Sequence, residues 1–431
     1  YTAFLLFPLF GLFLLGYLLF TSDEPRALLT RQMVMKYLFA FIKIFGLATL
    51  TFFILLPASF LNPSLFFKGA SQFLNPNHWP YWLAGLGLVT LLVFTLWKYG
   101  TDQRLLALQS WIKERSLFLT RSVVTVLGFI LFLSLINVWT GQALAPVEAL
   151  RDAAYANEPQ AFNFKPVLFK TAPFYEKWFE VGLMEIFPFV FSLTPILFVG
   201  MLLGLIGLWK NIFSPRAKVM VFAIFAFILL YFFATYQARV VTNARYMIAL
   251  FPLVALAGAV ALDEWLRRLV KAELQQKAWL FLTVLLFLWG TFTLWQLKPF
   301  YFSYANFLLP KDQSIHDSWG HGFYEAAQYL NSLPNATELK VWSNSNTLCR
   351  FFVGKCFQSR RIDLAQTTPD YFVMSKRGVV KVRNQPVLKN NPWPLRNTAY
   401  YIDKLQNNPE WSLLINGRPD NFVNIVRFEK E

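Results

Sequence analysis

The chain has 431 residues, of which 56% are hydrophobic and 47 are phenylalanine, and its formal net charge is +16. This composition excludes an ordinary soluble domain, which carries fewer apolar and aromatic residues. The sequence contains no recognisable DNA- or RNA-binding motif, so the positive charge indicates contact with anionic membrane lipids and no nucleic-acid partner.

Long apolar stretches dominate the first two thirds of the chain. A membrane-spanning helix needs roughly 20 predominantly apolar residues. Eight stretches meet this requirement: Thr2–Phe20, Tyr37–Phe60, Tyr81–Trp97, Leu117–Val138, Ile186–Trp209, Val219–Tyr236, Tyr246–Leu262 and Ala278–Leu297. The sequence therefore predicts an all-α polytopic membrane region of about eight transmembrane helices over residues 1–298.

The loops between these stretches alternate between basic and nearly uncharged. Short loops rich in Lys and Arg remain on the cytoplasmic side during insertion. The four basic loops contain Arg26, Arg31 and Lys36; Lys98, Arg104, Lys113 and Arg115; Lys210, Arg216 and Lys218; and Arg267, Arg268, Lys271 and Lys277. The loops with Lys68 and with Arg239 and Arg245 are sparser and are predicted to lie outside. Both ends of the sequence then face outward.

The sequence opens at Tyr1 in an apolar stretch, without the charged region that begins a signal peptide. A first span that enters from the outside usually follows an earlier span. We therefore expect this sequence to be the C-terminal part of a longer membrane protein.

The longest outer loop, Trp139 to Glu185, interleaves aromatic residues with lysines. This mixture favours the headgroup level of a bilayer. Two interpretations stay open: an interfacial helix that anchors the loop, or a lid over a lipid-linked substrate.

After Lys298 the apolar runs shorten, and residues 299–431 are predicted to form a small extracytoplasmic α/β domain. Helical spacing of apolar residues predicts a helix over 323–330. Shorter apolar runs predict strands at Glu338–Trp342, Leu348–Val353, Asp370–Met374, Trp411–Asn416 and Phe422–Phe428. Residues 384–397, rich in Pro and Asn, are predicted to form a surface loop.

Ionisable residues are nearly absent from the spans. Ion-coupled transporters hold their coupling ion with Asp, Glu or His in mid-membrane, and the spans contain no such group at their centres. Lys43 is the deepest charge and is expected to extend its ammonium toward the interface or to pack against a neighbour. This pattern favours chemistry at the outer surface over ion-coupled transport.

Four segments resemble one family: Tyr1–Pro8, Arg245–Pro252, Lys298–Asn306 and Trp319–Ala327. They are similar to parts of the polytopic glycosyltransferases of the GT-C superfamily, in the branch of protein mannosyltransferases and aminoarabinose transferases. The Arg-Tyr entry into a late helix with a following Pro, and the Trp-Gly segment, are the most specific features.

The resemblance implies transfer of a sugar from a polyprenyl-phosphate donor to a glycan, lipid or protein acceptor on the outer face of a bacterial inner (plasma) membrane. The family's usual catalytic aspartate lies in the first outer loop, which would precede Tyr1. The catalytic residue is therefore not assigned, since Glu148, Asp152, Glu176 and Glu180 show no paired spacing for general acid–base catalysis. No cofactor is predicted, and the sequence leaves a divalent-ion requirement open.

Three residues are predicted to bind the donor phosphate. Arg245 lies at the outer end of the seventh predicted span, where a guanidinium can give a phosphate two parallel hydrogen bonds. Tyr246 can add a hydrogen bond, and Arg239 is a weaker second cation. Each of them is alternatively an interfacial anchor.

The post-membrane segment contains Trp319, His321 and Gly322 in a predicted tight turn, in which glycine supplies a positive φ. Trp319 and His321 are candidates for a wall of the acceptor site. His316 and His321 match no metal-ligand spacing, so no metal site is predicted.

The two cysteines, Cys349 and Cys356, both fall in the outer domain. Their spacing suits a hairpin that brings them opposite each other, and an oxidising exterior permits a disulfide. Two buried thiols are the alternative.

The sequence thus favours a multi-pass membrane glycosyltransferase that uses a polyprenyl-phosphate sugar donor. The alternative is a non-catalytic membrane assembly protein or a lipid-linked glycan transport protein.

Overall fold

The computed structural model describes residues 110–111, 114–156, 174–237, 247–315, 321–358, 369–384, 398–418 and 420–428. The chain divides into two compact units, each considered by itself below. The first comprises Tyr1–Ser122 and Asn211–Ala223, and the second comprises Val123–Lys210 and Ile224–Glu431. In the described part of the first unit, which holds the beginnings of α8 and α13, Lys218 donates to the side chain of Asn211.

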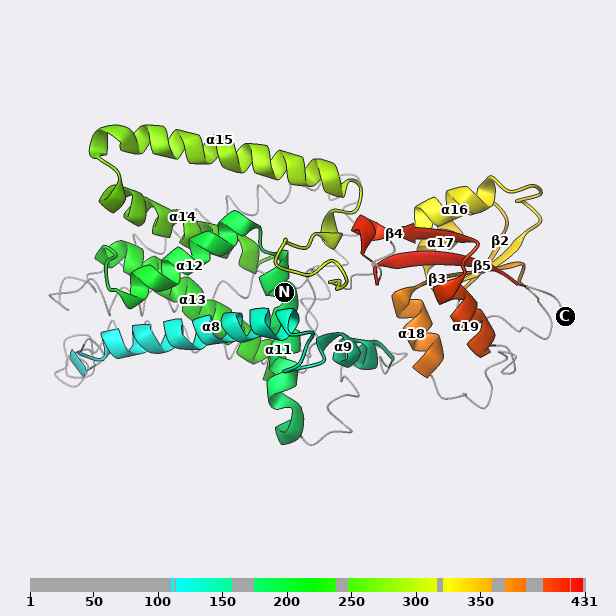
Figure 1. Ribbon diagram of the computed structural model, residues 1–431, viewed down its shortest axis with the longest axis horizontal. Coiled ribbons are helices and arrows are strands. Elements are labelled where there is room, and N and C mark those ends of the chain that lie inside the picture. The colour runs from blue at the N-terminus through cyan, green and yellow to red at the C-terminus, as the bar shows by residue number, and fades with distance from the viewer. Residues whose placement is uncertain are drawn as a thin grey trace, which may run out of the picture. The chain divides into compact units, whose positions relative to one another are not determined.

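Within the described ranges, three helices are long and apolar enough to cross a membrane: α8 (Ser116–Trp139), α13 (Pro215–Gln237) and α15 (Ala272–Leu297). A fourth candidate is a bent pair, α11 (Phe174–Ser192) followed by α12 (Pro195–Trp209). These helices indicate a membrane protein (Figure 1). No residue of α15 is buried, as suits a helix that contacts lipid along its length.

The prediction of about eight spans is not supported. The predicted spans 2–20, 37–60 and 81–97 lie outside the described residues. The predicted seventh span falls in α14 (Leu250–Leu269), which is not among the three candidates because its second half carries four charged residues. They are Asp263, Glu264, Arg267 and Arg268.

The predicted fifth span is also not one continuous helix. The chain turns by 117° between α11 and α12. Thr194 has ψ 151° and precedes Pro195, which is the first residue of α12. A proline disfavours helical backbone in the residue before it and donates no amide hydrogen bond, so one helix ends and another begins here.

Helices α12 and α14 pack closely through two glycines. A Cβ built on Gly200 would lie 2.9 Å from the Cα of Gly258. The indole Nε1 of Trp265 also donates to the carbonyl of Leu203, at 3.1 Å. Small residues that allow two backbones to approach are typical of helix pairs in membranes.

The C-terminal part contains a five-stranded mixed sheet of order β2-β1-β3-β5-β4. The strands are β1 (Lys340–Ser343), β2 (Lys355–Gln358), β3 (Tyr371–Ser375), β4 (Trp411–Leu414) and β5 (Phe422–Arg427). Strand β1 pairs in parallel with β2 and β3, whereas β5 pairs antiparallel with β3 and β4.

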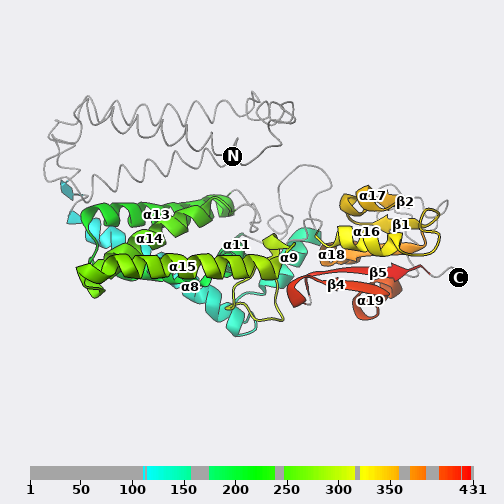
Figure 2. The same cartoon turned by 90° about the horizontal axis from the view of Figure 1, so that it is seen from above.

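Helices cover both faces of this sheet (Figures 1 and 2). One face is covered by α16 (Phe323–Asn331) and α17 (Asn346–Phe351), and the other by α18 (Lys376–Asn384) and α19 (Thr398–Asn407). Every residue of β3 is buried, and its side chains alternate between the two cores. The alternation follows from the period of two in a strand, and a strand buried on both faces reads as a continuous apolar run.

One predicted strand is wrong. Residues 348–353 were expected to be extended, but α17 occupies Asn346–Phe351. The Ser345 side chain accepts a hydrogen bond from the Thr347 amide and so caps this helix. Leu348 and Phe352, four residues apart, enter the same core. The predicted loop at 385–397 lies outside the described residues.

Candidate functional site

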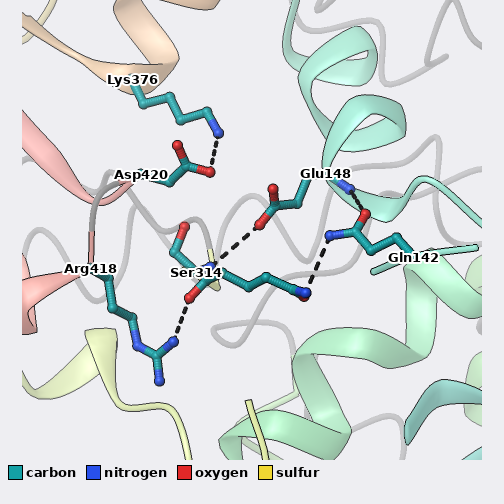
Figure 3. A network of polar contacts seen from close by, with 7 residues as sticks. Gln142, Glu148, Ser314, Lys376, Arg418 and Asp420 are labelled. Atoms are coloured by element: carbon teal, nitrogen blue, oxygen red, sulfur yellow. Dashed lines mark hydrogen bonds and ion pairs between the residues drawn. The ribbon is translucent and has the colours of Figure 1, made fainter. Parts of the chain in front are cut away.

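Seven polar residues, called the polar junction below, lie where segment 304–315 meets α9 (Val147–Ala156), α18 and the turn before β5 (Figure 3). They are Gln142, Glu148, Gln313, Ser314, Lys376, Arg418 and Asp420. All belong to the second compact unit.

The loop between α8 and α9 positions the first two of these residues. The Asn137 amide oxygen accepts hydrogen bonds from the backbone of Leu144, at 3.0 Å, and of Ala145, at 2.7 Å. Gly141 and Gln142 adopt positive φ values of 67° and 65° in the resulting turn. The Gln142 side chain then accepts a 3.0 Å hydrogen bond from the Glu148 amide, which would otherwise lack a partner in the first turn of α9.

Segment 304–315 is fixed to the ends of two helices. The Asn306 side chain donates to the carbonyls of Val190 and Leu193, at 2.9 and 3.0 Å, where α11 ends. The Gln313 side chain donates to the Val138 carbonyl near the end of α8, at 3.3 Å. The last carbonyls of a helix lack intrahelical partners, so these contacts satisfy groups that would otherwise need water.

Arg418 connects the sheet to the same segment. It follows η4 (Ile415–Gly417) and donates to three backbone carbonyls: Pro310 at 2.7 Å, Leu309 at 3.4 Å, and Gln313. Burial lowers the pKa of this guanidinium and the nearby Asp312 carboxylate opposes the shift. Because these carbonyls take its donors, Arg418 fixes the segment and is not arranged to bind a substrate.

The two carboxylates of the junction are both engaged. Asp420 forms an ion pair with Lys376, at 2.5 Å. An oxygen of Glu148 accepts from the Ser314 amide at 3.4 Å. Of the four acids that the sequence left unassigned, the structure thus brings Glu148 to the junction. The side chains of Asp152 and Glu176 lie outside the described residues, and Glu180 is half-buried in α11.

His321 is half-buried just before α16, with its ring 5.9 Å from the ring of Phe300 and perpendicular to it. Burial lowers the pKa of its imidazole, opposed by the Glu325 carboxylate. His321 is therefore predominantly neutral at pH 7. The predicted turn is present at Gly322, which has φ 81° and lies where a Cβ would approach a Val423 methyl group to 2.8 Å.

The other predicted site residues lie outside the described residues: Arg239, Arg245, Tyr246 and Trp319. Their predicted roles therefore stay predictions. Among the described His, Cys, Asp and Glu residues, no group of three is arranged to hold a metal ion.

Cys349 and Cys356 form a disulfide with a Cα–Cα distance of 5.2 Å. The expected hairpin geometry is wrong, because the bond joins helix α17 to strand β2. Cys356 also packs against the core beneath α16 and α17.

Sequence reasoning missed one residue of the loop between Trp139 and Glu185. Arg151, on α9, is fully buried, and its guanidinium carbon lies 5.6 Å from the centroid of the Phe187 ring on α11. In the sequence it is one cation among several in an aromatic loop, and the only signal was that loop's mixture of aromatic and basic residues.

The chain has no match among protein-family models, curated proteins or solved structures.

Proposed function

We propose that this protein transfers a sugar from a polyprenyl-phosphate-linked donor to an acceptor on the outer face of the membrane. The observation that carries the proposal is the attachment of the α/β layer to the ends of apolar helices. Arg418 binds segment 304–315, and the same segment binds the ends of α8 and α11 through Gln313 and Asn306.

This arrangement suits a lipid-linked substrate. Such a substrate keeps its chain among apolar helices and presents its phosphate and sugar at the interface, where a polar layer can bind them. The resemblance of four segments to GT-C glycosyltransferases supports the same function.

In this proposal each predicted site residue keeps the role that the sequence suggested for it. Arg245, with Tyr246 and Arg239, binds the donor phosphate at the outer end of the predicted seventh span. Trp319 and His321 form a wall of the acceptor site, and His321, being neutral, contributes shape and a hydrogen bond rather than charge. The proposal assigns no catalytic base, and the membrane is the bacterial inner membrane.

Substitution of Arg245 tests the proposal. Arg245→Ala should reduce kcat/KM for the donor roughly 10- to 150-fold, the range for losing hydrogen bonds to a charged group. Arg245→Lys should recover part of this loss, since an ammonium keeps the charge but not the planar two-point contact. Arg239→Ala should have a smaller effect.

The measurement is sugar transfer from a defined polyprenyl-phosphate donor by purified full-length variants, with folding checked by size-exclusion chromatography. Wild-type kinetics in a folded Arg245→Ala protein would show that this arginine is only an interfacial anchor. A wild-type protein that binds the donor without transferring sugar would favour the non-catalytic alternative.

A further inference from the structure

Arg151 is a buried cation whose side-chain nitrogens have no acceptor among the described residues. The residue is fully buried on α9, which packs against α11 (Figure 1). None of its three side-chain nitrogens donates a hydrogen bond to any described residue. The Phe187 ring, 5.6 Å from the guanidinium carbon, supplies a cation–π contact near the outer limit for this interaction.

A buried guanidinium without hydrogen-bond acceptors lowers the stability of a protein that has no anion bound to it. An arginine keeps its charge in proteins and offers five N–H donors. A buried charge without a hydrogen-bonded partner destabilises the fold, and a single cation–π contact offsets only part of the desolvation penalty. A missing partner of opposite charge would remove this penalty.

Arg418, in the same compact unit, differs from Arg151 in having acceptors for its hydrogen bonds. Arg418 is less deeply buried, yet three backbone carbonyls accept its hydrogen bonds. The chain therefore places acceptors around a guanidinium that serves the fold. No described carboxylate does this for Arg151, although Glu148 lies three residues earlier on α9 and Glu185 is buried on α11.

We propose that Arg151 binds the phosphate group of a ligand at the contact of α9 with α11. A guanidinium fork matches two phosphate oxygens, and the interaction is stronger away from water. The fully buried Phe187 ring lies against the guanidinium and packs on the ring of Phe191, with a centroid distance of 4.9 Å, so this side of Arg151 is shielded from water.

Two sources can supply this phosphate: the headgroup of a polyprenyl phosphate or free inorganic phosphate. The lipid source rests on the proposed function, since α9 lies in the loop that the sequence places at the headgroup level. Binding of an anion to Arg151 itself does not require the protein to transfer sugar.

The test compares full-length wild type with Arg151→Met, Arg151→Lys and a matched control, Arg350→Met, which removes an exposed arginine from α17. Without ligand, Arg151→Met should unfold at a higher temperature than wild type, because it removes an uncompensated buried charge while keeping the side-chain volume. A purely structural role for Arg151 predicts the opposite shift.

Binding is then measured with undecaprenyl phosphate, with inorganic phosphate and with the uncharged lipid undecaprenol, each added alone to protein in detergent. Arg151→Met should bind the phosphate-bearing probe about 10- to 100-fold more weakly than wild type and Arg350→Met. Arg151→Lys should be intermediate. If Arg151→Met does not fold, the weaker binding of Arg151→Lys alone carries the test.

A lipid source of the phosphate is supported if undecaprenyl phosphate binds in an Arg151-dependent manner and inorganic phosphate does not. Free phosphate is supported as the ligand if inorganic phosphate binds with the same dependence on Arg151. Equal affinity of wild type and folded Arg151 variants for both probes, or no binding of either probe to wild type, would overturn the inference. Arg151-dependent binding in a protein that transfers no sugar would overturn the proposed function but not this site.

Discussion

Arg418 holds two parts of the chain together through backbone acceptors alone. Its guanidinium reaches carbonyls at Leu309, Pro310 and Gln313, and the neighbouring Asn416 donates to the Ser303 carbonyl at 3.2 Å. Backbone carbonyls do not change protonation, so this connection is insensitive to pH over the range in which the protein is folded. Its strength comes from charged donors in a half-buried setting.

Removal of this side chain should loosen segment 304–315. Arg418→Ala leaves several carbonyls without a donor and should destabilise the second unit by about 1.5 to 3 kcal/mol. Limited proteolysis should cleave this segment faster in Arg418→Ala than in wild type, while Arg350→Ala, at an exposed position of α17, should match wild type. Cleavage of Arg418→Ala at the wild-type rate would show that other contacts suffice to hold the segment.

Among helices and strands, the sequence correctly predicted those in which the apolar residues are also the buried residues. Helix α16 buries Phe323, Ala326, Ala327 and Leu330, the residues whose spacing predicted it. Strands β3 and β5 are nearly continuous apolar runs because both of their faces are covered. For these elements, local sequence and tertiary packing require the same residues.

The elements that were missed depend on contacts that no local pattern displays. Residues 348–353 contain enough apolar and aromatic residues to suggest a strand, yet the Ser345 cap and the core contacts of Leu348 make α17 helical. Helix α18 contains Val379 and Val380, which favour strands in isolation, but Val379 packs in the core on the far face of the sheet. Tertiary burial overrides local propensity at both places.

The membrane orientation can be tested at single positions in the elements. Lys271 lies between α14 and α15 in a loop predicted to be cytoplasmic, whereas Lys311 follows α15 and is predicted to lie outside. In intact cells an impermeant thiol reagent should label Lys311→Cys, and should label Lys271→Cys only after permeabilisation, because basic loops remain inside. The native cysteines are oxidised and should not react. Labelling in the reverse order would invert the topology.

At the scale of the whole molecule, the sequence predicted an apolar helical part followed by an α/β part. It did not predict the polar junction, because Gln142, Gln313 and Arg418 are far apart in the chain and ordinary in composition. It also missed Arg151, since the burial of a single arginine on a short helix such as α9 leaves no mark in the local sequence. Long-range hydrogen bonds and burial are properties of the folded chain alone.

The proposed function requires the protein to break the bond between a sugar and its polyprenyl-phosphate carrier. The most direct measurement uses full-length protein in sealed liposomes, with envelope lipids and glycans as acceptors and a donor labelled separately in its sugar and its lipid. If the protein is a transferase, the sugar label moves to an acceptor while the lipid label is released as polyprenyl phosphate. Donor that crosses the bilayer with both labels still joined, or that stays unchanged, would contradict the account.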